Sequence, residues 1–407
     1  MKRRDLLATI GTGILGGFAG CQGIAGHVCG DRTRAQTSDR AGTAASDSRT
    51  VAPESLPVPE SDLVRSAPRD AIPAITAPKF APNYTDLELE GYWWGTGESF
   101  TYTLELIDDD PVIGVEREGT ARAYPLKVLV WHEVVNDDFG GPILVTYCPL
   151  CGSGIVAERR VDGEPTDFGV SGLLWKDNLV MYDERTESLW NQLSATAIRG
   201  VKTGTELSIQ PSTFTSFGDW RTDYPDTTVL LPAPISGTIV SIRAPPYPRD
   251  PYERYYNSTE VGDDRSDFAD DRLHPKTIVL GVEIDGEAIA YPPSAIGENG
   301  VINDTVGSVP IVVTTNRAGE PVAYDRRIDG RSYEFDRTDD DHLKAADTKW
   351  DPSTGQGMSG QYADIRLTPI TSTKRLFWFA WLEFNPGSEL YTDDDDQGLF
   401  GVGCRLL

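Results

Sequence analysis

Two cysteines three positions apart are the residues of this 407-residue chain best suited to chemistry. Cys148 and Cys151 belong to the string Cys-Pro-Leu-Cys-Gly, which directly follows the strand-like apolar run 143–147. Two thiolates at this spacing can hold one metal ion. A glycine after the second cysteine lets backbone N–H groups turn toward the sulfurs, as in rubredoxin and zinc-ribbon knuckles. The string therefore predicts a metal-binding turn.

The remaining ligands of such a site must come from elsewhere, because the sequence has no second Cys-x-x-Cys pair. His132 and Met181 are the candidates. Together with two thiolates they make a soft ligand set that favours copper or zinc over magnesium or calcium. Three protein ligands leave a coordination position open for substrate binding or electron transfer. Glu133 is a candidate general base for a metal-bound water, or equally a surface carboxylate.

A redox-active disulfide is the second interpretation of the same pair, with Cys148 as the attacking thiol. Thioredoxin-type pairs lie at a helix N-terminus, whose dipole stabilises the thiolate. Residues 152–157 have the pattern of a strand instead, which weakens this interpretation. A structural disulfide or two inert thiols are the further alternatives.

An internal repeat separates scaffold residues from chemical ones, because residues 112–230 resemble residues 279–390. The shared positions are turn glycines, apolar strand residues and polar turn residues such as Asn136-Asp137, repeated as Asn303-Asp304, for which we expect a structural role. The differences fall on the candidate site: His132 becomes Asn299, Glu133 becomes Gly300, Cys148 becomes Asn316 and Cys151 becomes Gly319. The site is therefore expected in the first copy alone.

The fold class predicted from these patterns is β-rich α+β, with two homologous tandem domains and no long helices. Short strands are expected at 112–115, 121–124, 143–147, 154–158 and 179–182 in the first copy. Helical turns are expected within 126–135 and 293–302. The predicted limits are 76–235 for the first domain, 236–276 for an extended connector and 277–407 for the second domain. Trp190 and Trp350 occupy matching positions and are expected to anchor the cores, a carbohydrate platform being the alternative.

The N-terminus has the features of an export signal. Arg3-Arg4 precedes a short apolar stretch, and small residues lead to Cys21, a pattern similar to a twin-arginine signal with a lipobox. Residues 1–21 are therefore predicted to be a lipoprotein signal, with an ordinary cleaved signal or a single anchor helix as the alternative. Residues 22–75 have the composition of a disordered tether. We expect a protein anchored by lipid on Cys21 to the outer face of the cell membrane.

The charge of the chain limits its partners. The formal net charge is −26, and the acidic residues are spread along the sequence. Nucleic acid is therefore not expected as a partner, and we expect a highly solvated surface suited to a salt-rich habitat.

Five cysteines are too few for a scaffold held together by disulfides. The sequence does not indicate which protein or envelope component the chain binds. The third interpretation is a cell-surface binding module without catalysis, which would use exposed tryptophans at positions 93, 94, 175 and 190.

Several strings together resemble one known family. They include 145–152, Val-Thr-Tyr-Cys-Pro-Leu-Cys-Gly; 131–133, Trp-His-Glu; 181–183, Met-Tyr-Asp; and 188–190, Ser-Leu-Trp. Over about residues 70–390 the chain resembles the family called domain of unknown function 3179. The resemblance implies a secreted or lipid-anchored protein of bacteria or archaea, and it assigns no activity. The Pro293 of the second copy, where the first has Leu126, departs from the family pattern.

Overall fold

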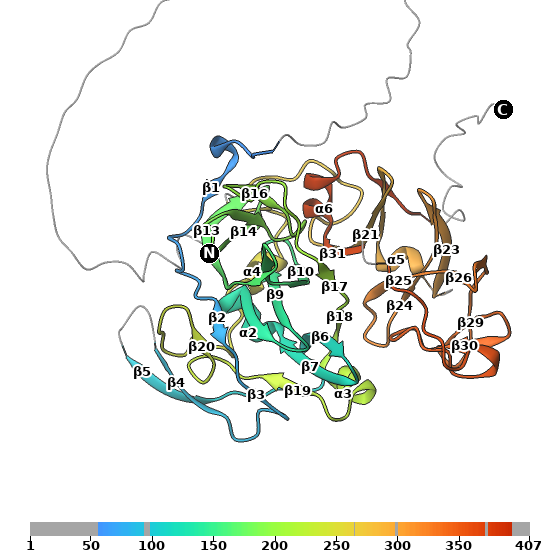
Figure 1. Cartoon of the computed structure of the whole chain (residues 1–407), viewed down its shortest axis with the longest axis horizontal. Helices are drawn as coiled ribbons and strands as arrows, with labels where there is room; N and C mark the ends of the chain where they lie inside the picture. The colour runs from blue at the N-terminus through green and yellow to red at the C-terminus, as the bar shows by residue number, and fades with distance from the viewer. Residues whose placement is uncertain (1–55, 93–97, 264, 298–299, 371–372, 393–407) are drawn as a thin grey trace, which may run out of the picture.

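The computed structural model of this chain describes residues 56–92, 98–263, 265–297, 300–370 and 373–392. The predicted signal residues Arg3, Arg4 and Cys21 lie outside these ranges. Two β-rich halves lie side by side (Figure 1), and the connector adds its strand β20 to a sheet of the first half. No helix of the described ranges is long and apolar enough to cross a membrane.

Three sheets and two hairpins make up the first half. The central sheet has the order β17 (Ile209–Gln210), β10 (Ser153–Glu158), β9 (Pro142–Cys148), β8 (Val134–Asp138), β2 (Ile75–Ala77) and β20 (Gly237–Thr238). A second has the order β18 (Thr213–Ser216), β6 (Pro111–Arg117), β7 (Thr120–Pro125), β19 (Thr228–Leu230) and β3 (Phe80–Ala81). The third has the order β1 (Val64–Arg65), β13 (Phe168–Trp175), β14 (Asn178–Asp183), β15 (Leu189–Asn191) and β16 (Ala197–Arg199). The hairpins are β4 (Glu88–Tyr92) with β5 (Ser99–Thr103), and β11 (Arg160–Val161) with β12 (Glu164–Pro165).

The second half repeats much of this strand order. The order β18-β6-β7-β19 recurs as β31 (Thr373–Phe377), β21 (Ile278–Ile284), β22 (Glu287–Tyr291) and β32 (Glu389–Leu390), and in both sets the last pair is parallel. The order β8-β9-β10 recurs as β23 (Val301–Val306), β24 (Val309–Thr315) and β25 (Pro321–Asp325). The hairpin β26 (Arg327–Ile328) with β27 (Arg331–Ser332) matches β11-β12. The set β28 (Asp336–Arg337), β29 (Leu343–Ala345) and β30 (Thr348–Trp350) follows it, as β13-β14-β15 does in the first half.

Helices are short, as expected from the glycine and proline content. The longest are α2 (Leu126–His132), α3 (Phe217–Asp223) and α6 (Trp378–Phe384), with seven residues each. The others are α4 (Glu253–Tyr256), α5 (Pro293–Ile296) and the 3-10 turns η1 (Glu60–Asp62) and η2 (Gly360–Tyr362). The β-rich architecture predicted from the sequence is confirmed, and the five expected strands of the first copy are present as β6, β7, β9, β10 and β14 with slightly wider limits.

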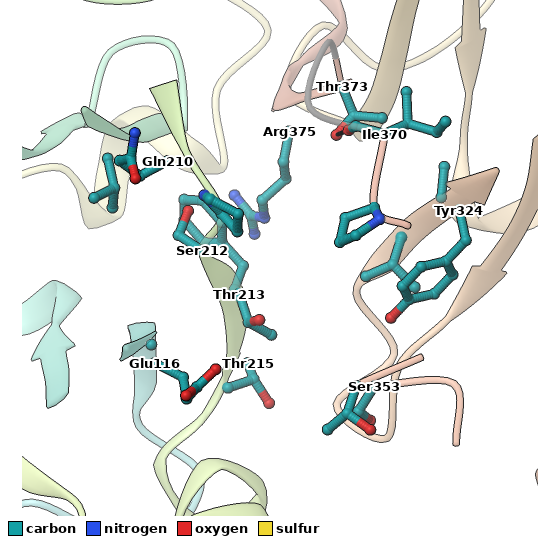
Figure 2. A pocket seen from close by; sticks show the side chains of 18 of the residues that line it. Glu116, Gln210, Ser212, Thr213, Thr215, Tyr324, Ser353, Ile370, Thr373 and Arg375 are labelled. Carbon is teal, nitrogen blue, oxygen red and sulfur yellow. Dashed lines mark hydrogen bonds between the residues drawn. The ribbon is translucent and has the colours of Figure 1, made fainter. Parts of the chain in front are cut away.

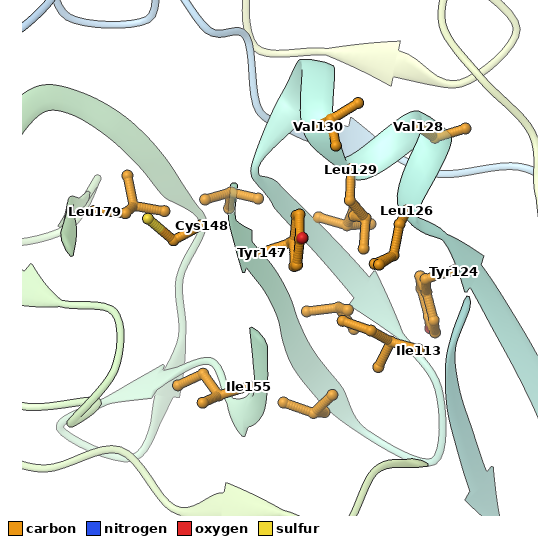
Figure 3. Close-up of a cluster of buried hydrophobic side chains, with 14 of the residues drawn as sticks. Ile113, Tyr124, Leu126, Val128, Leu129, Val130, Tyr147, Cys148, Ile155 and Leu179 are labelled. Carbon is orange, nitrogen blue, oxygen red and sulfur yellow. The ribbon is translucent and has the colours of Figure 1, made fainter. Parts of the chain in front are cut away.

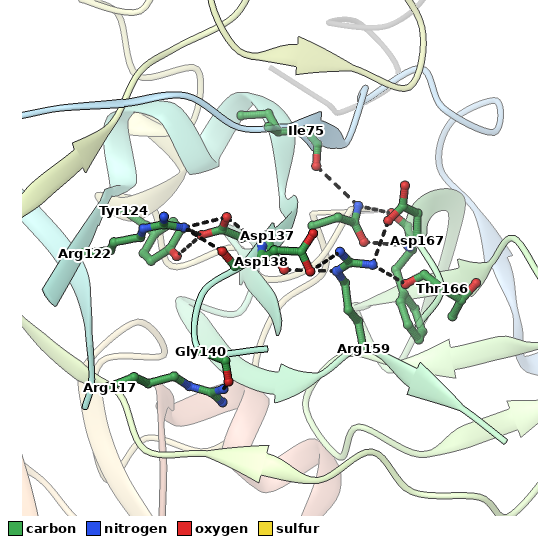
Figure 4. A network of polar contacts seen from close by, with 12 residues as sticks. Ile75, Arg117, Arg122, Tyr124, Asp137, Asp138, Gly140, Arg159, Thr166 and Asp167 are labelled. Carbon is green, nitrogen blue, oxygen red and sulfur yellow. Dashed lines mark hydrogen bonds and ion pairs between the residues drawn. The ribbon is translucent and has the colours of Figure 1, made fainter. Parts of the chain in front are cut away.

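The polar residues shared by the two copies carry equivalent hydrogen bonds. The Tyr124 hydroxyl donates to Asp137 at 2.6 Å, and the Tyr291 hydroxyl donates to Asp304 at 2.7 Å. Figure 4 shows how Asp137 is further tied to Arg122. These bonds pair buried polar groups within the scaffold.

The shared asparagines have the same kind of role. Asn136 exchanges two hydrogen bonds with the backbone of Phe168, and Asn303 does the same with Phe335. Each asparagine thereby fixes a strand of its half to the strand that starts the next sheet. This agrees with the structural role expected for the Asn-Asp pair.

One predicted boundary differs from the structure. Residues 56–75, which the composition predicts to belong to the tether, contain β1 and the start of β2, and they bury Val58, Ala67 and Ala74. These scattered apolar residues are inconspicuous in sequence because their partners lie far along the chain. The Val58 N–H, for example, donates to the carbonyl of Ile198. Ordered structure therefore begins before residue 76.

Candidate functional site: a buried thiol pair

The Cys-Pro-Leu-Cys-Gly turn joins β9 to β10. Cys148 ends β9 and pairs with Ser153, the first residue of β10, so the intervening residues form a tight loop at the end of a hairpin. Gly152 has a φ of 63°, and an added Cβ would lie 2.8 Å from the Phe377 ring. Only glycine accommodates both the left-handed backbone and the close ring. The cysteines therefore lie in a turn that directly follows a strand and leads into another.

The two thiols are buried next to each other in the core of the first half. Cys148 is 1 % exposed and Cys151 is fully buried, and Cys148 is close enough to Cys151 to influence its pKa. The Cys151 sulfur lies 3.3 Å from the Asp177 carbonyl oxygen, and the Cys148 sulfur lies 4.0 Å from the same atom, at the limit for sulfur. Figure 3 shows the Cys148 sulfur beside Leu179. Burial, with the neighbouring Cys148 adding to it, raises the pKa of Cys151 well above its usual value.

The Asp177 carbonyl oxygen, toward which both thiols point, belongs to a hairpin turn. Lys176 and Asp177 connect β13 to β14, and both have positive φ values, 50° and 54°. Two consecutive left-handed residues are the mark of a two-residue type I′ turn. This turn places the Asp177 carbonyl beside the sulfurs, and the next residue, Asn178, is close enough to Cys151 to act on its pKa, in the lowering direction.

A buried amide network lies behind the thiols. Asn178 donates to Gln192 Oε1 at 2.9 Å, and Ser153 donates to the same oxygen at 3.1 Å. The Gln192 amide nitrogen donates to Thr146 Oγ1 at 2.9 Å. All four residues are fully buried. The network holds β10, β14 and β15 around the thiol turn, and Gln192 is its central residue.

His132 is held by hydrogen bonds at both ring nitrogens. Nδ1 lies 2.7 Å from the Pro73 carbonyl oxygen, which can only accept, so Nδ1 carries the proton. Nε2 lies 2.7 Å from the Tyr247 hydroxyl. Complete burial lowers the pKa of His132 to about 4, so the ring is neutral at pH 7 and Nε2 accepts from Tyr247. His132 would bind a metal through Nε2 only after Tyr247 moved away.

Glu133 combines full burial with a left-handed backbone. It ends α2 with a φ of 60°, and its N–H donates to the Leu129 carbonyl. The matching residue of the second half is Gly300, which has a φ of 66° and donates to Ile296 in the same way. A non-glycine residue in this conformation costs about 1–2 kcal/mol, and burying a carboxyl group adds to that. The turn alone would be served better by glycine.

Met181 lies on β14, fully buried, on the face that also presents Leu179 to the main core. Its cross-strand partner is Trp190, and the matching tryptophan of the second half, Trp350, is opposite Leu343. The thioether thus stands where the second half has Leu343. Within the part of the chain that the structure describes, no group of three or more His, Cys, Asp or Glu side chains is arranged to hold a metal ion.

Two segments from outside the hairpin cover the thiol turn, and together they donate hydrogen bonds to three of its carbonyls. The Tyr255 hydroxyl of the connector donates to the Leu150 carbonyl at 3.0 Å. From β31 of the second half, the Phe377 N–H donates to the Cys151 carbonyl at 2.8 Å, and Arg375 Nη1 donates to the Gly152 carbonyl at 2.9 Å. Sequence reasoning missed Asp177, Tyr255 and Arg375, because none lies in a recognisable motif.

The tryptophans offered for surface binding give that interpretation no support. Trp190 is fully buried and Trp175 is 9 % exposed, while Trp93 and Trp94 lie outside the described residues. The matching Trp350 is also fully buried. The described members of this set pack in the cores.

With this geometry in view, comparison with known proteins identifies the family. A model for the family described as protein of unknown function, DUF3179, matches residues 69–388. The chain belongs to this family. No curated protein and no solved structure matches the chain. This match confirms the family resemblance that the Cys-Pro-Leu-Cys-Gly string and its surroundings indicate. The family has no assigned activity, so the function is inferred from the site.

Proposed function

We propose that this DUF3179 protein binds a soft metal ion, copper(I), through Cys148 and Cys151. The observation that carries the proposal is the pair of buried thiols at the tip of a closed hairpin, with both sulfurs within 4.0 Å of the same Asp177 carbonyl oxygen. Thiolates select copper(I) or zinc, and copper(I) is satisfied by two of them, whereas structural zinc takes four ligands. Met181 adds a thioether on the same side of the core, which favours copper further.

The neighbouring candidates have different roles in this proposal. His132 in its present hydrogen bonds supports the connector and the N-terminal segment, and it joins the metal only if Tyr247 is displaced. Glu133 is retained for its carboxyl group, because costly backbone conformations cluster at functional sites. Metal binding must expel the thiol protons. The Glu133 carbonyl accepts from the Tyr147 N–H, so this buried acid lies beside the strand that ends at Cys148.

The test is metal analysis of the full-length protein purified without chelator, beside the Cys148→Ser/Cys151→Ser variant. We expect copper close to one equivalent in the parent and none in the double variant. Thr166→Val, which alters a buried hydroxyl group outside the thiol turn, is the control and should retain the metal. Equal copper in parent and double variant would remove the proposal.

A dithiol–disulfide couple is the second candidate, favoured by the same two buried sulfurs beside one carbonyl oxygen. Oxidation converts two neutral thiols into a neutral disulfide, with two electrons and two protons passing to an external oxidant. A buried pocket that raises the thiol pKa does not oppose this uncharged product. Metal-free protein whose two thiols disappear together in a titration against glutathione would support this alternative over copper binding.

We further propose that the chain has two homologous tandem domains and is exported and anchored by lipid on Cys21. The repeated strand order and the repeated Tyr-Asp and Asn-backbone bonds support the duplication. The paired arginines and the lipobox-like sequence support the anchor. In cells, Cys21→Ser should move the protein from the membrane fraction to the soluble fraction, and an unchanged distribution would argue against the anchor.

A further inference from the structure

The two halves touch through equivalent positions of their edge strands. Thr213 is opposite Gly114 in the first half and Lys374 is opposite Gly281 in the second. The next residues, Phe214 and Arg375, therefore correspond to each other. The Arg375 guanidinium lies 4.6 Å from the centre of the Phe214 ring. Matching positions of β18 and β31 are thus in direct contact.

The repeated turns contact the opposite strands reciprocally. Arg375 on β31 donates to Gly152 in the thiol turn of the first half. Asn316, which occupies the position of Cys148 in the second half, donates through its amide to the Phe214 carbonyl on β18 at 2.8 Å. Each turn therefore bonds the edge strand of the other half. This exchange of equivalent contacts is the pattern of an isologous, twofold interface.

Arg375 lies where the two turns converge. Its Nε and Nη2 atoms form a bidentate pair with Glu320 at 2.6 and 2.7 Å, while Nη1 holds the Gly152 carbonyl. Glu320 is the counterpart of Gly152 in the repeat. A bidentate carboxylate fixes the plane of a guanidinium, so the remaining N–H group is aimed at one place. The thiol-free half thus delivers a rigid donor to the thiol turn.

The boundary between the halves is open beside this contact. A cleft of about 210 Å³ lies between β18 and the segment around Tyr324, and Figure 2 shows Arg375 at one end of it. Thr213 and Thr215 line one wall, and Ser353 and Thr373 line the other. Because side chains do not fill this region, the bonds at Arg375 are not backed by continuous packing along the whole boundary.

We propose that Arg375 is a positioning residue for the thiol pair, so that the half without cysteines completes the site of the half that has them. By holding the Gly152 carbonyl, Arg375 fixes the turn that sets the spacing and direction of the two sulfurs. The effect on metal binding rests on the proposed copper function, whereas the effect on the turn itself does not.

The experiment compares full-length wild type, Arg375→Ala and Glu320→Gln. Arg317→Ala is the matched control, because Arg317 pairs with Asp223 across the same boundary without touching the thiol turn. Two quantities are measured: the rate at which iodoacetamide modifies Cys148 and Cys151 in metal-free protein, and the affinity for copper(I) read from thiolate–copper absorbance. Circular dichroism confirms that each variant is folded.

We expect Arg375→Ala to weaken copper(I) binding by about 10- to 100-fold, as loss of a supporting partner does at other metal sites, and to accelerate thiol modification. Glu320→Gln should also weaken copper(I) binding and accelerate thiol modification, but to a smaller extent. If Arg375→Ala does not fold, the result for Glu320→Gln tests the inference. Arg317→Ala should resemble wild type. Wild-type values in both Arg375→Ala and Glu320→Gln, or an equal effect of Arg317→Ala, would overturn the inference. If wild type binds no copper, the proposed function fails and the iodoacetamide rates still decide the role of Arg375.

Discussion

At the scale of single residues, the first half contains a strained backbone position and buried ionisable groups where the second half has glycine. Glu133 is a buried carboxyl group in a left-handed conformation where the second half has Gly300. Cys151 is a thiol whose pKa is raised by burial, where the second half has Gly319. Positions at which one copy is strained and the other relaxed identify residues kept for chemistry rather than for folding.

The residue-scale prediction is that Glu133→Gly stabilises the protein. The substitution relieves a backbone strain of about 1–2 kcal/mol and removes a buried acid, which together outweigh the lost side-chain packing. We expect a higher midpoint of thermal unfolding and weaker copper(I) binding in the same variant. Glu118→Gly, at another left-handed but exposed turn position, is the control and should leave copper binding unchanged. A lower midpoint for Glu133→Gly would show that the carboxyl group serves the fold.

At the scale of secondary-structure elements, α2 joins segments that are distant in sequence. Its last residue, His132, bonds Pro73 just before β2 and Tyr247 in the connector. The Tyr247 hydroxyl also lies 3.2 Å from the Ala233 carbonyl. One neutral imidazole therefore links the start of the first half to the segment that covers the thiols, and protonation of the ring would break the bond that Nε2 accepts.

The element-scale prediction concerns acid. The pKa of His132 is about 4 in the folded protein and about 6.5 in the unfolded chain. Between these values the unfolded state binds the proton first, so stability is complete above pH 6.5 and is lost as the pH falls toward 4. The linkage amounts to about 2 kcal/mol by pH 5. Denaturant unfolding of metal-free wild type and of His132→Asn at pH 7 and pH 5 measures this change in the free energy of unfolding. An equal loss of stability in both proteins would contradict the role given to His132.

At the scale of the whole molecule, the chain has a net charge of −26, and its two halves are joined partly by the ion pairs Arg317–Asp223 and Arg366–Glu116. Self-repulsion among the surface carboxylates opposes the compact state. Salt at 1 M shortens the screening length to about 3 Å, from about 10 Å at 0.1 M, and weakens that repulsion far more than it weakens half-buried pairs such as Arg375–Glu320.

The whole-molecule prediction is therefore that salt stabilises the protein. Raising sodium chloride from about 0.1 M to about 2 M should raise the thermal midpoint by several degrees, because screened carboxylates no longer repel across the surface. Calorimetry at constant pH gives the midpoint, with sucrose of matched osmolality as the control for excluded-solute effects. A midpoint that falls steadily with salt would mean that surface ion pairs outweigh repulsion.

The sequence by itself determined the scaffold and the thiol pair. Apolar runs and turn signals located the strands β6, β7, β9 and β10, because strand patterns and turn chemistry are local properties. The comparison of the two copies assigned Asn136 and Asp137 to structure and Cys148 and Cys151 to a site, and the structure agrees in placing the asparagine and aspartate in repeated scaffold bonds.

Only the tertiary structure decided what surrounds the thiols. The donors to the turn come from far along the chain, since Arg375 and Gly152 are 223 residues apart and Tyr255 and Leu150 are 105 apart. The same packing directed His132 to Pro73 and Tyr247, a pairing that its position beside Glu133 in the sequence did not indicate. Local patterns fix which strands form, whereas the contacts that enclose a buried site depend on how distant strands pack.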